Sequence, residues 1–285
     1  MTEELDVQKE CQKELVALVN RLRQVVTDQA NDIKNREPNV TERSLILSSS
    51  VSKLNELARV ILQIRSLDAI DEMQVLLRSM LELVVNACYL QQASDDEVWK
   101  YLHFDPINNH TAMTDLERAS GGRLRIPKEL AERTTKFATD ASAASNLPLG
   151  SRDWSKKNLF KRAVSVDKAV GGDDLAMLMA NIYVTGSGYV HTTYKTLHRH
   201  ANWLLHGKKE HPLRMLFGTN NAIHGVALVL INLGRYFNRK YDTARQPFNE
   251  AAVIAEHLAN VANEDHSNHR KKHKAKVSHS DGCGE

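Results

Sequence analysis

The chain has 285 residues, 42% of them hydrophobic, so it can bury a substantial core as one large domain or two small ones. Aromatic residues make up only 6%, while Leu, Ala, Lys, Glu and Arg recur at helical spacing, which argues against a β-sandwich or β-barrel. The formal net charge of +3 is too small to indicate a dedicated nucleic-acid-binding protein, because such proteins carry a large, clustered basic excess.

Apolar residues recur at intervals of three and four, which predicts an all-α protein, a multi-helix bundle of long antiparallel helices. The predicted helices span residues 4–33, 41–64, 69–91, 95–119, 126–144, 158–170, from 173 or 174 through 191, 213–241 and 248–262. The third is apolar nearly all round, which favours a central position. Ser94 is the predicted N-cap of the fourth helix, Pro106 is a candidate break within it, and Asp173 or Asp174 is the predicted cap of the seventh. Trp154, in the loop before residue 158, is predicted to anchor that loop.

These helices suggest three segments: an N-terminal helix within 1–38, a helical bundle domain over 39–263 and a tail over 264–285. The N-terminal helix is a candidate dimerisation arm. The tail is rich in His and Lys and lacks the apolar content needed for packing, so we expect it to be disordered. The tail contains three histidines at steps of three and four, His266, His269 and His273, which would share a helical face if the tail folded. No carboxylate or cysteine completes a metal-binding set with them.

The cysteines Cys11, Cys88 and Cys283 are odd in number and lack CxxC spacing, which is typical of a reducing compartment. The N-terminus is polar and acidic, unlike a signal peptide, and the longest apolar run, around residues 226–233, is too short to span a bilayer. We therefore expect a cytoplasmic protein without a membrane partner. The sequence also lacks the motifs of nucleotide hydrolysis, dinucleotide binding and zinc proteolysis, so no cofactor or metal is expected.

Two rows of polar residues, each within a predicted apolar helix, form the candidate site. The first row is Gln74, Arg78, Glu82 and Asn86, and the second is Tyr183, Ser187 and His191. Steps of four keep side chains on one side of a helix, so each row can direct donors and acceptors at one place. Gly186 and Gly188 flank Ser187 and each costs a helix about 1 kcal/mol, which favours close approach of another helix or a ligand.

The two rows allow two interpretations, and the sequence leaves both open. In a catalytic site, His191 is the general acid or base, Arg78 holds an anionic group such as a phosphate, and Glu82 orients either one. Tyr183 can donate and accept hydrogen bonds, whereas Ser187 as a nucleophile lacks a strained turn and oxyanion donors. In a structural network, the same residues satisfy one another and fix which helix faces which.

Three segments together resemble the bacterial domain of unknown function family 5677: RSMLELVVNACYL, the tryptophan loop with NLFKRAVSVDKAVG, and YVTGSGYVH. The recurring marks of that family are an R-S-x-x-E helix and a later Y-x-x-x-S-x-x-x-H helix. They correspond here to Arg78 with Glu82, and to Tyr183 with Ser187 and His191. The resemblance covers about residues 41–200 and implies a helical fold without an established activity.

The family is also distantly similar to HEPN-type helical domains, many of which are dimeric toxin or phage-defence ribonucleases with an Arg-x(4 to 6)-His pair. Arg199 and His206 have this spacing. The resemblance implies that His206 acts on the ribose 2′-hydroxyl while Arg199 steadies the phosphate, in a metal-free cleavage. About two or three such spacings arise by chance in a chain with this Arg and His content, and the alternative is a solvated basic surface.

The first functional hypothesis is RNA binding or metal-independent RNA cleavage in a phage-defence or toxin-like system. The second is a non-enzymatic helical interaction or scaffold module whose polar rows are structural. The expected partners are RNA, a second copy of the chain in a homodimer, and a protein encoded nearby.

Overall fold

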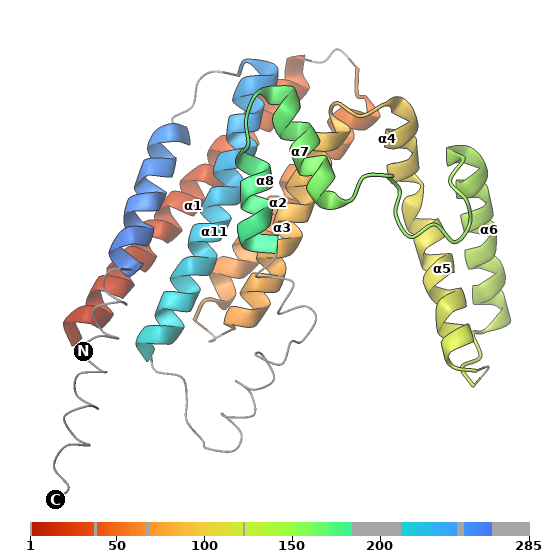
Figure 1. Cartoon of the computed structure of the whole chain (residues 1–285), viewed down its shortest axis with the longest axis horizontal. Helices are drawn as coiled ribbons and strands as arrows, with labels where there is room; N and C mark the ends of the chain where they lie inside the picture. The colour runs from red at the N-terminus through yellow and green to blue at the C-terminus, as the bar shows by residue number, and fades with distance from the viewer. Residues whose placement is uncertain are drawn as a thin grey trace, which may run out of the picture. The chain divides into compact units, whose positions relative to one another are not determined.

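The structure, a computed structural model, describes residues 2–36, 39–66, 69–121, 123–183, 212–243 and 248–263. All regular secondary structure in these ranges is helical (Figure 1), which confirms the predicted all-α class. The chain separates into two compact units, one holding the residues up to Cys88 and from Ala163 onward, the other holding Tyr89–Arg162. The tail over 264–285, predicted to be disordered, lies outside the described residues.

The first unit is built mainly from long helices. Its elements are α1 (Thr2–Arg36), α2 (Glu42–Ile64), α3 (Ile70–Leu90), α7 (Leu159–Val170), α8 (Asp174–Leu178), the π-helix η1 (Met179–Tyr183), α11 (Pro212–Tyr241) and a last helix over residues 248–263. The boundary between the units falls inside α3 and inside α7. Helix α2 starts at a capping box, in which the Ser44 N–H donates to the Thr41 hydroxyl and the Thr41 N–H donates to Ser44 Oγ.

Helix α1 presents one apolar stripe to its own unit. The stripe consists of Leu15, Val19, Leu22, Val26, Ala30 and Ile33, none of them more than 5% exposed. Polar side chains fix the position of α1: Gln8 Nε2 donates to the Ala262 carbonyl at 2.9 Å, and Gln29 Nε2 donates to Asn238 Oδ1 at 2.7 Å. The stripe of the proposed dimerisation arm is therefore covered within the chain, and a dimer contact through α1 would use its other faces.

Helix α11 runs in the same direction as α1 and α3 (Figure 1). Residue numbers rise together along α1 and α11, because positions 8, 29 and 36 of α1 bond to positions 220, 238 and 241 of α11. Successive positions of α3 likewise meet successive positions of α11: Ile70 lies against Gly218, Leu77 against Gly225, and the Cys88 carbonyl accepts from Tyr236 Oη at 3.0 Å.

The predicted antiparallel arrangement is therefore correct for the neighbours α1 and α2 but wrong for the pairs that α11 makes with α1 and α3. Helices α1 and α2 are antiparallel, and Asn55 Nδ2 donates to Thr27 Oγ1 between them at 2.7 Å. A short link forces neighbouring helices to reverse, whereas the long stretch of chain between α3 and α11 allows α11 to return in the same direction.

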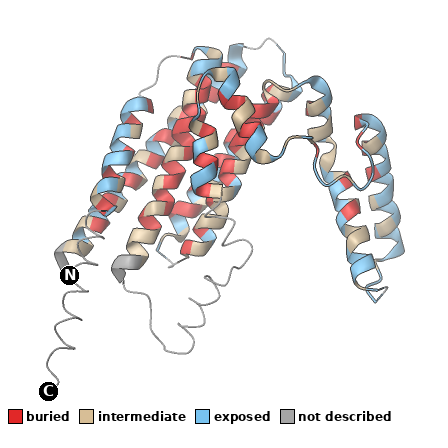
Figure 2. Ribbon diagram, in the orientation of Figure 1, coloured by how far each residue is buried: buried red, intermediate tan, exposed pale blue. Residues whose placement is uncertain are grey.

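Two helices in the described residues are long and apolar enough to cross a membrane by length and composition: Ile70–Leu90 and Met215–Tyr241. Their apolar windows are 56% and 67% buried inside the protein, as expected for core helices of a bundle. Figure 2 shows buried residues along much of both helices. The predicted central position of the third helix is thus confirmed, and the expectation of no membrane partner stays a prediction.

The second unit contains α4 (Asp95–Leu102), α5 (Phe104–Ala119) and α6 (Lys128–Ser145). Ser94 caps α4 as predicted, accepting from the Glu97 N–H at 3.3 Å. The predicted single helix over 95–119 is broken at His103, ahead of the predicted break at Pro106. Pro106 lacks the N–H that would bond four residues back to Leu102, so the break precedes the proline, which itself fits the first turn of α5.

Trp154 anchors the loop that follows α6, as predicted from the sequence. Its side chain is buried, its ring lies 6.0 Å from that of Tyr89 and 5.1 Å from that of Tyr101, and the Arg162 guanidinium stacks 4.2 Å from its ring. Arg162 Nη2 also donates to Asp153 Oδ1 at 2.5 Å. The tryptophan thus joins the end of α3, α4 and the start of α7 within this unit.

Candidate functional site

Arg78 is the centre of the described part of the candidate site. It lies in the middle of α3, and its Nε donates to Glu82 Oε1 one helical turn later at 2.9 Å. Its Nη2 donates to the Tyr183 hydroxyl at 2.8 Å, and its guanidinium lies 4.2 Å from the centre of the Tyr183 ring. The structure therefore brings together members of both predicted rows, from positions 105 residues apart.

The first row lies along the border of the core. Gln74, Arg78, Glu82 and Asn86 are all half-buried. The buried face of α3 is formed by apolar residues at the intervening positions, including Met73, Leu77, Met80, Leu81, Val84 and Val85. Steps of four therefore produce a polar edge beside an apolar face, which is the arrangement that the sequence predicted.

Burial separates the roles of the two charged residues. The Arg78 side chain is 14% exposed and the Glu82 side chain 39%, so the cation is largely enclosed and the carboxylate remains reachable by water. Two of the three guanidinium nitrogens, Nε and Nη2, are engaged, but Nη1 is buried and has no hydrogen-bond partner among the described residues. A buried guanidinium N–H without an acceptor is costly, and an anionic oxygen would satisfy it.

Tyr183 is positioned by an unusual helix start. The carboxylate of Asp167, in α7, accepts from the N–H groups of Leu175 and Ala176 at 3.1 and 2.8 Å and so caps α8. The predicted cap was Asp173 or Asp174; Asp173 occupies the N-cap position but makes no side-chain cap bond. Asp167 replaces it because the turn at Gly171, with a φ of 72°, brings the end of α7 back over the start of α8.

The π-helix η1 carries Tyr183 at its last position. A π-turn holds more residues than an α-turn, so it shifts the side chains that follow around the helix axis, and such turns are frequent at functional sites. Helical periodicity in the sequence predicts continuous α-helix through this region and gives no signal for the π-turn.

An ion pair joins α8 to α11. Asp174 Oδ2 accepts from Arg239 at 2.8 Å, and its Oδ1 lies 3.6 Å from Arg235. The residue predicted as a cap thus fixes the helix that leads to Tyr183 against the central helix. Sequence reasoning missed this pair because the partners lie 65 residues apart.

Four candidate residues lie outside the described residues, namely Ser187, His191, Arg199 and His206. Their predicted roles stay predictions. Among the described residues, no group of three or more His, Cys, Asp or Glu side chains could hold a metal ion.

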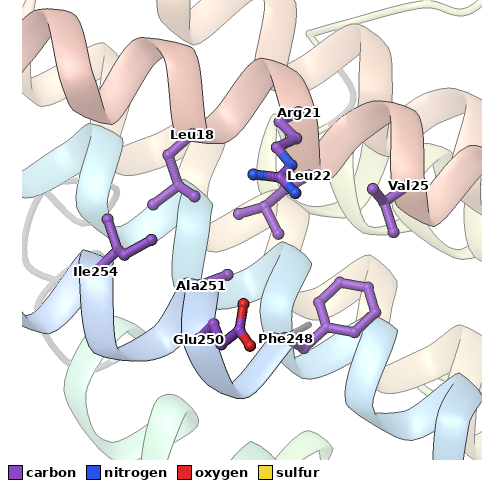
Figure 3. A pocket seen from close by; sticks show the side chains of 8 residues that line it. All are labelled: Leu18, Arg21, Leu22, Val25, Phe248, Glu250, Ala251 and Ile254. Atoms are coloured by element: carbon purple, nitrogen blue, oxygen red, sulfur yellow. The ribbon is translucent and has the colours of Figure 1, made fainter. Parts of the chain in front are cut away.

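A small cavity lies apart from these residues, between α1 and the helix over 248–263 (Figure 3). Its volume is about 50 Å³, and its lining is Leu18, Arg21, Leu22, Val25, Phe248, Glu250, Ala251 and Ile254. Ligand sites usually enclose several hundred Å³, so this space suits water or a packing gap better than a substrate.

The second unit holds a polar cluster that the sequence analysis did not single out. Tyr89 Oη donates to Glu97 Oε1 at 2.7 Å, Ser155 Oγ donates to the same oxygen at 3.3 Å, and the Lys157 ammonium lies 4.9 Å from the Tyr89 ring. Burial and the bond to Glu97 raise the pKa of Tyr89 to about 12, so its hydroxyl stays protonated at neutral pH. The cluster fixes the tryptophan loop, and its members are too dispersed along the chain to form a motif.

Comparison with known proteins places the chain in a family. The model of a family of unknown function (DUF5677) matches residues 44–209, more than half of the chain, and this range includes Arg78, Glu82 and Tyr183. No curated protein and no solved structure matches the chain. The likeness to HEPN-type domains stays a prediction. The roles of the RSxxE and YxxxSxxxH segments as family marks likewise stay a prediction. The resemblance is confirmed at the level of the family, and the chain belongs to the DUF5677 family.

Proposed function

We propose that this protein binds RNA and cleaves it without a metal ion, with Arg78 as the group that holds the scissile phosphate. The observation that carries the proposal is the state of the Arg78 guanidinium: it is nearly enclosed, oriented by Glu82 and Tyr183, and has a buried Nη1 without an acceptor among the described residues. A phosphate oxygen is a strong acceptor for such an edge.

The proposed reaction uses the 2′-hydroxyl of the RNA as nucleophile. A general base removes the proton from this hydroxyl, its oxygen forms a bond to the adjacent phosphorus, and the bond to the 5′-oxygen breaks. The leaving oxygen takes up a proton, which gives a 2′,3′-cyclic phosphate and a 5′-hydroxyl end. His191 is the proposed acid or base, with Arg199 and His206 as the alternative pair; Arg78 stabilises charge on the phosphate.

The biological setting follows the sequence resemblance to HEPN-type domains. We place the protein in the cytoplasm, in a phage-defence or toxin-like system, as a homodimer restrained by a protein encoded nearby. Ser187 and Tyr183 serve in this proposal to position the substrate and Arg78. The tyrosine hydroxyl already orients one edge of the guanidinium at 2.8 Å.

A second candidate function is a non-enzymatic helical interaction or scaffold module. The observation that favours it is that Arg78 joins α3 to η1 through one hydrogen bond and one stacked ring, as a structural network would. In this case the polar rows specify which helices pack together, and the surfaces of the bundle carry the function.

The test is cleavage of total cellular RNA and of a defined tRNA pool in EDTA. Wild type is compared with five variants, namely Arg78→Lys, Glu82→Gln, Tyr183→Phe, His191→Ala and His206→Ala. Loss of the general base is expected to slow cleavage by about 100-fold or more, and Arg78→Lys by a comparable factor because lysine cannot replace the planar guanidinium. Cyclic phosphate ends on the products distinguish this protein's chemistry from a contaminating metal-dependent nuclease.

Thermal melting of these variants and of Arg78→Ala separates the two candidate functions. A catalytic role predicts that Tyr183→Phe and His191→Ala melt within a few degrees of wild type while cleavage falls. A structural role predicts an RNA-inert wild type and an Arg78→Ala variant destabilised by about 3 kcal/mol or more, because its partners lose a largely buried charge. An inert wild type that binds no RNA would end the ribonuclease proposal.

A further inference from the structure

The connection between α5 and α6 is a strongly basic segment of the described chain. Residues 118–128 contain Arg118, Arg123, Arg125 and Lys128 and no Asp or Glu. All four side chains are exposed, Arg118 by 78% and Lys128 by 88%. We call these four residues the basic tip.

The charges of the basic tip are poorly neutralised. Arg118 and Lys128 each lie 3.7 Å from a single carboxylate, of Asp115 and Glu132, in exposed pairs that contribute little. Asp115 is also engaged by Arg152 at 2.7 Å. Among the described residues, Arg123 and Arg125 form no ion pair.

Backbone bonds hold this connection in a defined turn. The Gly121 N–H donates to the Arg118 carbonyl at 3.1 Å, and the Leu124 N–H donates to Ser120 Oγ at 3.1 Å. The Arg123 side chain bonds through Nε to the Ser120 carbonyl at 3.1 Å, which leaves its two terminal nitrogens free to point outward. The cations are thus presented by an ordered turn.

The start of α6 adds a second feature that favours anions. Its N-cap is Pro127, which makes no side-chain cap bond, so the first N–H groups of this 18-residue helix lack a side-chain acceptor. Arg125 and Lys128 stand at this positive end of the helix dipole, where cations are destabilising. A bound phosphate would relieve both the open N–H groups and the crowded charge.

We infer that the basic tip is a docking surface for the phosphodiester backbone of RNA. Four exposed cations suit phosphates that repeat along a strand. Three of them are arginines, whose guanidinium groups form bidentate hydrogen bonds with phosphate. The surface belongs to the Tyr89–Arg162 unit, so it is distinct from Arg78, Glu82 and Tyr183. The choice of RNA over other polyanions rests on the proposed function, whereas the surface itself does not.

An anionic membrane is the main competing partner. Membrane binding by a short turn requires apolar side chains that enter the lipid, in addition to basic residues. Leu124 lies exposed between the residues of the basic tip, and Leu116 and Leu130 are exposed just outside residues 118–128. Residues 116–130 contain no aromatic side chain, and the four cations outnumber these leucines, which favours a water-exposed polyanion over a lipid surface.

The experiment compares two variants of equal net charge. The tip variant carries Arg118→Gln, Arg123→Gln, Arg125→Gln and Lys128→Gln. The matched control neutralises four exposed lysines of the other unit, Lys9→Gln, Lys13→Gln, Lys34→Gln and Lys53→Gln. The probe is a fluorescent 20-nucleotide 2′-O-methyl oligouridine, which cannot be cleaved through its blocked 2′-oxygen. Anisotropy is measured over a series of salt concentrations, with DNA of the same length and phosphatidylserine vesicles as further probes.

The tip variant is expected to bind the oligouridine about 10-fold or more weakly near 0.1 M salt, and the control less than about 2-fold. The logarithm of the association constant decreases linearly with the logarithm of the salt concentration. In the tip variant this dependence is expected to be shallower by about 2 to 3, since each lost phosphate contact on a single strand removes about 0.7 from the slope. Equal weakening of both variants would overturn the inference, as would an unbound wild type. Loss of vesicle binding with unchanged oligouridine binding would replace RNA by a membrane.

The outcome is independent of catalysis. A protein that binds the blocked oligouridine through the basic tip but cleaves no RNA supports this inference and ends the catalytic part of the proposed function. A protein that cleaves RNA, but whose tip variant binds as wild type does, supports the proposed function and overturns the inference. DNA bound as tightly as the oligouridine, with the same loss in the tip variant, would show that the surface recognises phosphodiesters of either kind.

Discussion

Asp167 shows how one buried side chain sets the path of the chain toward Tyr183. Its carboxylate is 4% exposed and receives two backbone N–H groups at the start of α8. Burial raises the pKa of Asp167 above its ordinary value of 3.8, more than these N–H groups lower it. The N–H groups at the start of α8 therefore offset part of the cost of burying this carboxylate.

Replacing Asp167 by Asn is expected to destabilise the protein by about 1 to 2 kcal/mol at neutral pH, because the two N–H groups bond to different oxygens of Asp167 and the asparagine NH2 group cannot accept from one of them. The raised pKa adds a pH dependence. Because the pKa is raised by folding, the protonated Asp167 side chain adds to the free energy of unfolding. This contribution is fully present below pH 3.8 and is lost as the pH rises through the higher folded-state pKa. Urea unfolding of wild type and Asp167→Asn from acid to neutral pH should show that the difference between their free energies of unfolding decreases as the pH rises. A constant difference would contradict the shift.

At the residue scale, the sequence predicted the polar edge of α3 and its meeting with Tyr183. Both predictions used periodicity, which fixes which side chains share a helical face. The cap at Asp167 and the ion pair of Asp174 with Arg239 were missed, because each depends on a turn or on helices far apart in the chain. The spacing of residues along one helix does not indicate which distant residues it will contact.

Two glycines of α11 allow side chains of neighbouring helices to pack directly against its backbone. The ring of Phe248, in the helix over 248–263, lies against Gly234, where an added Cβ would sit 2.1 Å from the ring Cζ. Gly225 has the same relation to Leu77 of α3, with 2.4 Å to the Cδ2 atom. Small side chains at these two points allow the central helix to be approached on two sides.

Gly234→Ala is expected to cost about 1 to 3 kcal/mol through overpacking, despite the better helix propensity of alanine. A double-mutant cycle with Phe248→Leu checks the cause, since the smaller side chain removes the ring that meets the new methyl group. Urea unfolding should give a clearly smaller cost of Gly234→Ala in the Phe248→Leu background. The same cost in both backgrounds would place the strain elsewhere.

At the element scale, the sequence located most helices to within a few residues, since caps and apolar periodicity mark them. The break at His103 and the π-turn at Met179–Tyr183 were not predicted. Proline marks where a helix cannot continue, but the missing N–H moves the break to the turn before it. A π-turn has no residue signature of its own, so tertiary packing decides it.

The two units of the molecule differ in how much they bury. Helix α11 contributes many fully buried residues, including Ile223, Val226, Val229, Leu230 and Phe237. Helices α5 and α6 bury far less, and α5 contributes only Ile107 and Thr111 (Figure 2). Local stability follows buried contacts, so the hairpin of α5 and α6 should open more readily than the central helix.

Hydrogen exchange under native conditions checks this difference. Backbone amides in the middle of α11 are expected to exchange on the order of 100-fold more slowly than those in the middle of α5 and α6. Peptides covering both regions, followed by mass spectrometry, give the two rates in a single sample. Equal protection of the regions would mean that the chain opens as one cooperative body.

At the scale of the whole molecule, the sequence predicted the fold class but neither the separate unit Tyr89–Arg162 nor the parallel course of α11. Periodicity shows that a helix has an apolar face and leaves open which partner covers it. Direction depends on the connection: short links imply reversal, whereas the stretch before α11 is long enough for either direction.

The bonds that hold α1 in place have a consequence for the synthesis of the protein. Gln8 bonds to Ala262, 254 residues later, and Arg36 bonds to Tyr241, 205 residues later. At about 5 to 20 residues per second, a ribosome needs roughly 10 to 50 s to make the chain between these partners. During this time the apolar stripe of α1 has emerged without the helices that cover it. The contacts that fix α1 can therefore form only after residue 262 has been synthesised, and until then part of its apolar stripe stays open to other apolar surfaces.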